Sequence, residues 1–428
     1  DMRVLMFGWE FPPHIAGGLG TACYGMTKGL AKNGVEVLFV MPSASGDEDQ
    51  SAVRIINASD VAVYDTCCDV NDFLSKVQFL RVGSNLHPYI DPQEFTELVE
   101  REQRSQSSEF KFYFRQKYKF SGKYGANLME EVARYAMVAG AIASQNDFDV
   151  IHAHDWLTYL AGIAAKRISG KPLVIHVHAT EFDRGSNVNP EVFRLEKMGM
   201  EEADKVITVS NLTRNIVINK YGIDPSKVVT VHNAVDFSGR SSLSVSRGVP
   251  EKVITFLGRI TFQKGPEYFI EAAAKVLKVC PNVRFVMAGS GDMMNRCIRQ
   301  VAKLGIADRF HFTGFLKGDD VQKMFSLSDV YVMPSVSEPF GISPLEAMKS
   351  DVPTIISKQS GVAEVLKYAI KVDFWDIDAL ADAMFALLNY PAISKVAIEN
   401  GREEVDNLKW DAAATRVKAV YESAINGK

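Results

Sequence analysis

Two glutamates, Glu338 and Glu346, stand in the segment SEPFGISPLEA. The preceding run VYVMP predicts a buried strand, and the following SPLEAMKS predicts a helix. We expect Ser343 at the N-cap of this helix and Pro344 at its first position, so Ser343 and Glu346 could form a capping box. Open parallel sheets bind ligands at the carboxyl ends of their strands, where carboxylates can accept hydrogen bonds from hydroxyl groups.

Two cations stand at a second strand-to-helix corner, in GRITFQKGPEYF. Gly265 and Pro266 are expected to be the N-cap and first residue of a helix. Lys264 then lies beside the positive end of that helix, which is mildly unfavourable, and Arg259 is near. The pair is explained by an anion between them, such as a diphosphate, in preference to two solvated surface charges.

Four histidines, in the strings HAHDW and HVH, raise the question of a metal. Residues two apart on a strand share a face, so His152 could converge with His154, and His176 with His178. No further His or Cys cluster in the sequence completes a ligand set. A histidine at a strand end that donates to substrate is therefore preferred, and no metal is expected.

Two Asp-x-Asp strings are excluded as metal ligands by their positions. The string at 147–149 precedes its strand, and the one at 376–378 starts a helix.

Near the beginning of the chain, HIAGGLGTA opens the first helix, where Gly17 and Gly18 would let the backbone approach a phosphate. It is neither Gly-x-Gly-x-x-Gly nor a P-loop, and the second strand ends in FVMP without an acidic residue. A dinucleotide cofactor is therefore not expected.

The elements that position these residues alternate between strand and helix, which predicts an α/β fold with parallel sheets. A Ser-, Gly- and Arg-rich stretch over 236–251 predicts a linker. We expect an N-terminal domain over 1–240 and a C-terminal domain over 241–428. An irregular insertion is expected over about 43–123, and a terminal helix over about 410–426 should pack back on the first domain.

One stretch of the insertion, 110–124, interleaves basic and aromatic residues. It could be a platform on which sugar rings stack, but an amphipathic helix packed on the first domain is favoured.

Composition narrows the class of protein. The chain has 428 residues, 47% of them hydrophobic, and a net charge of −4, so we expect neither a nucleic-acid partner nor a membrane span. Its five cysteines include no Cys-x-x-Cys pair, and the opening residues do not have the pattern of a signal peptide. A cytoplasmic protein with reduced thiols is expected. No oligomeric state follows from the sequence.

Taken together, the motifs resemble those of retaining nucleotide-sugar glycosyltransferases of the GT-B fold. The similar motifs are GGLG, Gly258-Arg259 with Lys264-Gly265, the glutamate pair, and VHNAVD. GGLG with HAHDW is most similar to the bacterial glycogen synthase and starch synthase branch. Two departures are visible: Ala234 replaces the usual glycine of Asn-Gly-Val-Asp, and HIAGG lacks the lysine usual before Gly-Gly.

The resemblance implies two Rossmann-like doubly wound domains that face each other across a cleft. It implies that Arg259 and Lys264 hold the diphosphate, with the backbone of Gly17 and Gly18 near a phosphate, and that Glu346 binds the ribose. The donor sugar would be contacted by Glu338, with further contacts from Phe340, Gly341, Ile342, Asn233 and Asp155. His178 would contact that sugar near its reacting centre.

The implied activity is metal-independent, retaining transfer of glucose from ADP-glucose or UDP-glucose to an α-glucan. Three alternatives share parts of the pattern: transfer of a single sugar to a sugar phosphate, lipid or cell-surface glycan, epimerisation of a nucleotide sugar, and glycan binding without catalysis. The intact Arg259, Lys264 and glutamate pair argue against the binding protein, which has no use for a diphosphate clamp. A metallo-hydrolase would require a tightly bound metal.

Overall fold

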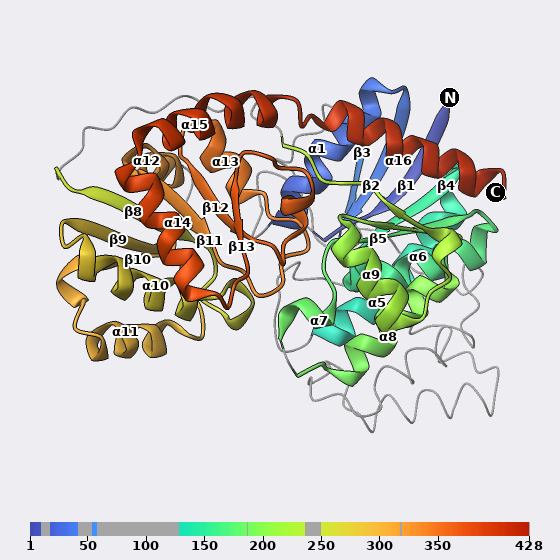
Figure 1. Ribbon diagram of the computed structural model, residues 1–428. Coiled ribbons are helices and arrows are strands. Elements are labelled where there is room, and N and C mark those ends of the chain that lie inside the picture. Colours follow the sequence, from blue (N-terminus) through green and yellow to red (C-terminus); the bar gives the residue numbers. More distant parts are fainter. Residues whose placement is uncertain are drawn as a thin grey trace.

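The computed structural model describes residues 1–9, 18–41, 54–57, 128–185, 187–235, 250–316 and 319–427. These residues form two parallel sheets with helices on both faces (Figure 1). The predicted α/β class with two doubly wound, Rossmann-like halves is thereby confirmed. Gly17, most of the 43–123 insertion, the 110–124 stretch and most of the 236–251 linker lie outside the described residues.

The first sheet has seven strands in the order β3-β2-β1-β4-β5-β6-β7. Its strands are β1 (Met2–Phe7), β2 (Val35–Met41), β3 (Arg54–Asn57), β4 (Val150–His154), β5 (Leu173–Val177), β6 (Lys205–Thr208) and β7 (Val228–Thr230). The helices of this half are α1 (Gly18–Lys32), α5 (Leu128–Gln145), α6 (Trp156–Ser169), α7 (Glu181–Arg184), α8 (Pro190–Glu202), α9 (Asn211–Tyr221) and the 3-10 turn η2 (Pro225–Lys227).

The second sheet has six strands in the order β10-β9-β8-β11-β12-β13, so its direction of winding reverses between β8 and β11. Its strands are β8 (Lys252–Leu257), β9 (Val283–Ala288), β10 (Phe310–Gly314), β11 (Val330–Met333), β12 (Thr354–Ser357) and β13 (Ile370–Val372). Its helices are α10 (Pro266–Val279), α11 (Met294–Lys303), α12 (Asp319–Leu327), α13 (Ser343–Lys349), α14 (Ile377–Asn389) and α15 (Pro391–Asp406), and its 3-10 turns are η3 (Phe262–Lys264), η4 (Ala307–Arg309) and η5 (Gly361–Glu364).

The central strands β4, β5, β11 and β12 are buried along their whole length, so both faces of the sheets are covered there, which explains why these strands read as continuous apolar runs. In β1, Val4 and Met6 belong to one core cluster and Leu5 and Phe7 to the other, and all four are 0% exposed. Successive side chains of a strand point to opposite faces, so β1 contributes to two cores.

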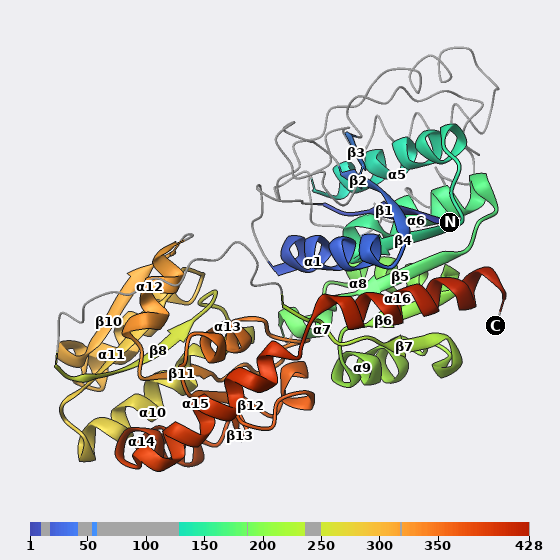
Figure 2. The same ribbon diagram turned by 90° about the horizontal axis from the view of Figure 1, so that it is seen from above.

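The last helix, α16 (Trp410–Ile425), returns to the first half and lies along α1 (Figure 2). Two glycines of α1 make room for it. A Cβ atom on Gly25 would lie 2.2 Å from the Trp410 indole nitrogen, and one on Gly29 would lie 2.7 Å from the Ala414 Cβ. Any side chain at these positions would push the two helices apart.

The chain crosses between the halves at two adjacent places. The Val235 N–H donates to the Leu408 carbonyl over 3.2 Å, and Val235 forms an isolated parallel bridge with Lys409.

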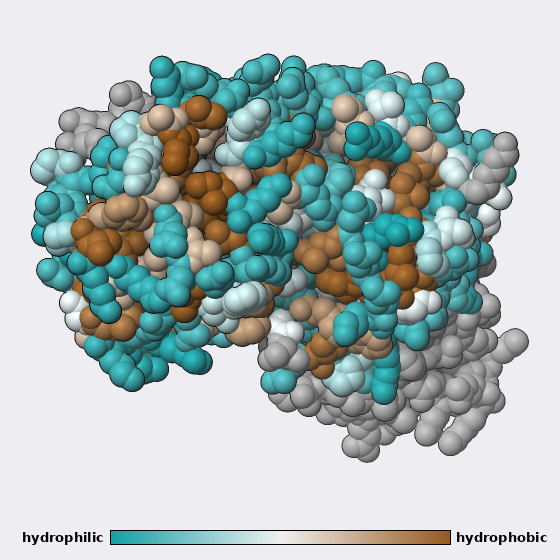
Figure 3. Space-filling view, viewed as in Figure 1, coloured by the Kyte–Doolittle hydropathy of each residue, from teal (hydrophilic) through white to brown (hydrophobic). Residues whose placement is uncertain are grey.

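Hydrophilic side chains dominate the face seen in Figure 3, with scattered apolar groups on both halves. Within the described ranges, no helix combines the length and the apolar character needed to cross a membrane.

Candidate active site

The predicted anion site lies where the second sheet reverses its winding. Arg259 follows β8 and is exposed, and it has no ion-pair partner among the described residues. Lys264 ends the 3-10 turn η3. Gly265 is the N-cap of α10 and Pro266 its first residue, as predicted. Ligands of doubly wound sheets bind at such a reversal, at the carboxyl ends of the strands.

Lys264 forms an ion pair with Glu338. Its Nζ atom donates to Oε2 of Glu338 over 2.5 Å, and the Ser335 hydroxyl donates to the same oxygen over 3.4 Å. The side chains of Lys264 and Glu338 are only 22% and 10% exposed. The Glu338 backbone is fixed as well, because its N–H donates to Gln359 O over 3.0 Å and its carbonyl accepts from the Gly361 N–H over 2.9 Å. The carboxylate is therefore held in one place.

The backbone after Glu338 turns sharply. Gly341 has a φ of 101°, which favours glycine, and its Cβ position would lie 3.1 Å from the Met333 methyl carbon. Phe340 is buried, and its carbonyl accepts a 2.8 Å hydrogen bond from the Val362 N–H. This turn carries the chain from Glu338 to Ile342 and the start of α13.

The predicted capping box of α13 does not form. The helix begins at Ser343, and its N-cap is Ile342, which makes no side-chain capping hydrogen bond. Helix geometry extends one residue further toward the N-terminus than predicted, because Ile342 already has αR backbone angles and its carbonyl accepts from the Glu346 N–H. Glu346 is half-buried in the first turn of α13, and capping does not account for its carboxylate.

In the first half, the four predicted histidines form two hydrogen-bonded pairs that stack on each other. His152 Nε2 lies 2.9 Å from His176 Nδ1, and His154 Nδ1 lies 2.9 Å from His178 Nε2. The His152 and His154 rings stack at 4.2 Å, as do those of His176 and His178. His152 Nδ1 also bonds the Tyr421 hydroxyl of α16.

All four imidazoles are neutral at physiological pH. Burial lowers the pKa of His178 to about 3, and burial together with the neighbouring His178 lowers the pKa of His152 to about 3. The pKa values of His154 and His176 also lie well below the ordinary value, first because of burial. His178 is the half-buried member, and it follows the end of β5, which is the strand-end position that the sequence predicted.

The structure corrects one prediction about this cluster. Cys23 of α1 completes a group of potential ligands with His154 and His178, although the sequence indicated no such third member. Cys23 belongs to the first helix, far from the histidines in the sequence. Only the packing of α1 against the ends of β4 and β5 brings it close, so no sequence signal could have identified it.

Asp155 holds the turn that carries His178. Its Oδ1 atom accepts from the N–H groups of His178 and Ala179 over 2.8 and 3.2 Å, and its φ is 61°. Such a φ is uncommon outside glycine and is maintained here by these bonds. Burial raises the pKa of Asp155 to about 6.

Two further predicted site residues also belong to the first half. Asn233 is buried in the segment after β7, and Gly18 is the first residue of α1.

The two halves meet through residues that sequence reasoning missed. The Ser337 hydroxyl donates to Asp183 Oδ1 over 2.6 Å, and Asp183 Oδ2 accepts from both the N–H and the hydroxyl of Thr180. The Thr-x-x-Asp spacing of Thr180 and Asp183 was a readable helix-start signal. The loop after His178 thus touches the loop that carries Glu338.

Glu364 makes a second contact between the halves. Its carboxylate accepts from the N–H groups of Asn211 and Leu212 at the start of α9 over 2.8 and 3.0 Å, and it lies 2.8 Å from His232 Nε2. Burial raises the pKa of Glu364, but these hydrogen bonds outweigh that effect and hold it below the ordinary value. The carboxylate is therefore ionised at the positive end of a helix.

Two doubly wound sheets, with Arg259 and Lys264 at the reversal of one and a histidine cluster at the strand ends of the other, are the arrangement of a glycosyltransferase of the GT-B class. Residues 3–231 match the family described as starch synthase catalytic domain, and residues 244–404 match glycosyl transferases group 1. The first match covers more than half of the 428 residues. The chain belongs to the starch synthase catalytic domain family.

Similar proteins match this chain over nearly its full length. An uncharacterized glycosyltransferase of Methanocaldococcus jannaschii is 28% identical over 444 residues, which cover 99% of each chain. A glycogen synthase of Mycobacterium tuberculosis is 24% identical over 454 residues, covering 100% of this chain and 96% of the relative. The structure of sucrose-phosphate synthase from Thermosynechococcus elongatus has the same fold, with a TM-score of 0.71 at 18% identity over 100% of both chains. The protein is a glycosyltransferase that uses a nucleotide sugar.

Proposed function

We propose that the protein transfers glucose from ADP-glucose or UDP-glucose to an α-glucan, with retention of configuration. The observation that carries this proposal is the largely buried Lys264–Glu338 ion pair at the reversal of the second sheet, with the exposed Arg259 following the adjacent strand β8. A diphosphate would be bound by Arg259 and Lys264. Glu338 would then accept from hydroxyls of the donor sugar, with the Phe340–Ile342 backbone beside it, while Glu346 binds the ribose.

In the proposed reaction, the bond between the sugar C1 and the diphosphate oxygen breaks, and a bond from C1 to the acceptor oxygen forms on the same face. The departing phosphate takes the acceptor's proton. Arg259 and Lys264 stabilise the charge that develops on the diphosphate, which is worth most where water is excluded. No step uses a metal ion or a cofactor.

Residues 1–240 are proposed to bind the acceptor and 241–428 the donor. His178 would hydrogen-bond the donor sugar near C1 through Nδ1, because its Nε2 is already bonded to His154. Asp155 contributes by holding the His178 turn, and Asn233 and the backbone of Gly17 and Gly18 are weaker candidates for direct contacts. Closure of the halves through Ser337 and Asp183 would exclude water.

The test is a screen of nucleotide-sugar donors for release of nucleotide diphosphate, with glycogen, with a sugar phosphate, and without acceptor. We expect glucan-dependent release from ADP-glucose or UDP-glucose and incorporation of α-linked glucose. Release with the sugar phosphate alone would support the single-sugar transferase. Conversion of a nucleotide sugar without any release would support the epimerase, and both outcomes would contradict the proposal.

A further inference from the structure

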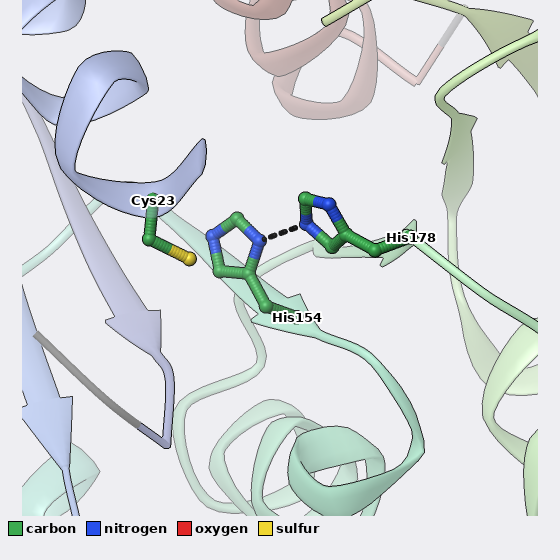
Figure 4. A group of neighbouring side chains, drawn as sticks. All are labelled: Cys23, His154 and His178. Carbon is green, nitrogen blue, oxygen red and sulfur yellow. Dashed lines mark hydrogen bonds between the residues drawn. The ribbon is translucent and has the colours of Figure 1, made fainter. Parts of the chain in front are cut away.

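Three side chains from separate elements gather at the strand ends of the first half: Cys23 of α1, His154 at the end of β4, and His178 after β5 (Figure 4). One sulfur or nitrogen atom from each lies within 4.8 Å of the other two. Zn–S and Zn–N bond lengths place the ligands of one tetrahedral zinc ion roughly 3.3–3.6 Å apart. The three atoms are therefore farther apart than the ligands of one zinc ion by at most about 1.5 Å.

The cluster contains a buried nitrogen without a hydrogen-bond partner. His154 is 0% exposed, and its Nε2 atom makes no hydrogen bond with any described residue, whereas its Nδ1 atom pairs with His178. Unsatisfied buried polar atoms are rare and call for an explanation, such as an ion that is bound under some conditions. In Figure 4 the Cys23 sulfur and the His178 ring both lie beside the His154 ring.

A second group of potential ligands, His152, His154 and His176, is a poorer site. Both nitrogens of His152 are engaged, one with Tyr421 and one with His176, and all three imidazoles are buried. An ion there would displace both hydrogen bonds of His152 and enter the core, whereas in the group with Cys23 it would replace the single bond between His154 and His178. His178, in contrast, is half-buried, so the group with Cys23 can be reached from outside.

We propose that Cys23, His154 and His178 bind one zinc ion, with water at the fourth position, and that this ion inhibits sugar transfer. One thiolate and two imidazoles form a ligand set that zinc prefers over magnesium or calcium. On binding, the Cys23 thiol loses its proton to solvent, bonds to the ion replace the hydrogen bond between His154 and His178, and each imidazole stays neutral with its hydrogen on the nitrogen that faces away from the ion. Nothing is oxidised or reduced, and affinity rises with pH.

Inhibition rests on the proposed role of His178. A zinc ion bound at Nε2, in place of the hydrogen bond to His154, would shift the ring whose Nδ1 is proposed to bond the donor sugar and would add a positive charge beside that sugar. Zinc should therefore lower turnover and compete with the nucleotide sugar, while the diphosphate site around Lys264 stays intact.

The experiment starts from a Cys67→Ser/Cys68→Ser background, which removes the two adjacent cysteines as competing ligands. Equilibrium dialysis with zinc chloride should give one ion per chain, and cobalt(II) should give a thiolate charge-transfer band. Cys23→Ser in this background should abolish the band and weaken zinc binding by about 100-fold or more. Cys297→Ser is the matched control, because Cys297 is equally buried but lies in the second half, and it should bind zinc like the background.

Failure of the background protein to bind a stoichiometric ion would overturn the site, as would zinc affinity within about threefold after Cys23→Ser. Inhibition is measured separately, as the ratio of each variant's activity with and without zinc. Stoichiometric binding without inhibition would keep the zinc site and instead overturn the role of His178 in transfer.

Discussion

The Ser337 hydroxyl and the Asp183 carboxylate, 154 positions apart in the sequence, are joined by a 2.6 Å hydrogen bond between the halves of the molecule. Ser337 precedes Glu338, which pairs with Lys264, and Asp183 lies in the short helix after His178. The bond therefore connects the donor-side carboxylate to the proposed sugar-contacting histidine. Closure of the halves and positioning of the donor should depend on it.

Ser337→Ala removes this bond and leaves Asp183 with its Thr180 partners. A hydrogen bond to a charged group contributes about 1.5–3 kcal/mol, so kcat/KM should fall by about 10- to 100-fold. Steady-state kinetics with the identified donor measures this effect. Ser326→Ala, at a surface serine of α12, is the control and should behave like the parent. Unchanged kcat/KM in Ser337→Ala would mean that this contact has no part in closure.

Lys264→Gln should lower kcat by about 100-fold or more, because one cation that stabilises the leaving diphosphate is lost. It also leaves Glu338 without its ion-pair partner, so the melting temperature should drop slightly. Lys275→Gln is the matched control, because it removes an ion pair with Asp378 on the exposed face of α10. Equal activities of the two variants would contradict the diphosphate site.

Glu346→Gln and Glu338→Gln should have separable effects. Glu346→Gln should keep the melting temperature, since no capping box is lost, and weaken nucleotide diphosphate binding by about 1–3 kcal/mol. Glu338→Gln should bind free nucleotide diphosphate nearly as tightly as the parent but lose transfer. Isothermal titration with nucleotide diphosphate tests both, and wild-type binding by Glu346→Gln would withdraw the ribose role.

Sugar transfer should persist in EDTA, because the proposed reaction uses cations of the chain and no metal. If the zinc site is occupied in the purified protein, EDTA should raise the rate. Initial rates are compared before and after dialysis against EDTA. Loss of turnover that magnesium or manganese restores would contradict the proposed mechanism.

Glu196→Gln should flatten the pH dependence of stability. Burial raises the pKa of Glu196 from 4.5 to about 8, against the effect of Arg184. The folded state thus binds a proton that the unfolded state releases above pH 4.5, and stability falls as pH rises from there to about 8, by at most about 1.4 kcal/mol per pH unit. Urea unfolding at several pH values measures this slope. The control, Glu201→Gln, changes a side chain that is 58% exposed, and it should keep the parent slope.

The sequence was sufficient for features determined by local patterns. Continuous apolar runs predicted the parallel strands, and Gly265-Pro266 predicted the start of α10 correctly, because both depend on neighbouring residues. The N-cap of α13 was predicted at Ser343, which is one residue too late. Helical geometry already begins at Ile342, because the chain turns sharply at Gly341. The strand ends carrying His178 and Arg259 were predictable for the same local reasons.

Contacts between distant segments could not be read in this way. Three residues, Cys23, Asp183 and Glu364, act through contacts with residues of other elements. The sequence around each of them does not indicate which residue it contacts. Thr180-x-x-Asp183 predicts only a helix start, although Oδ1 of Asp183 accepts a hydrogen bond from Ser337 of the other half. Such relationships require the relative placement of whole elements.

The return of α16 to the first half has a consequence for synthesis on the ribosome. Trp410 and Tyr421 of α16 complete the core cluster to which β1 and α1 contribute, so this core cannot be covered before α16 has been made. Domains generally fold as units as they emerge, but here the second half can close its sheet before the first half is covered. Until α16 has been synthesised, the nascent chain exposes the apolar face of α1 and is then the form most open to chaperones or to aggregation.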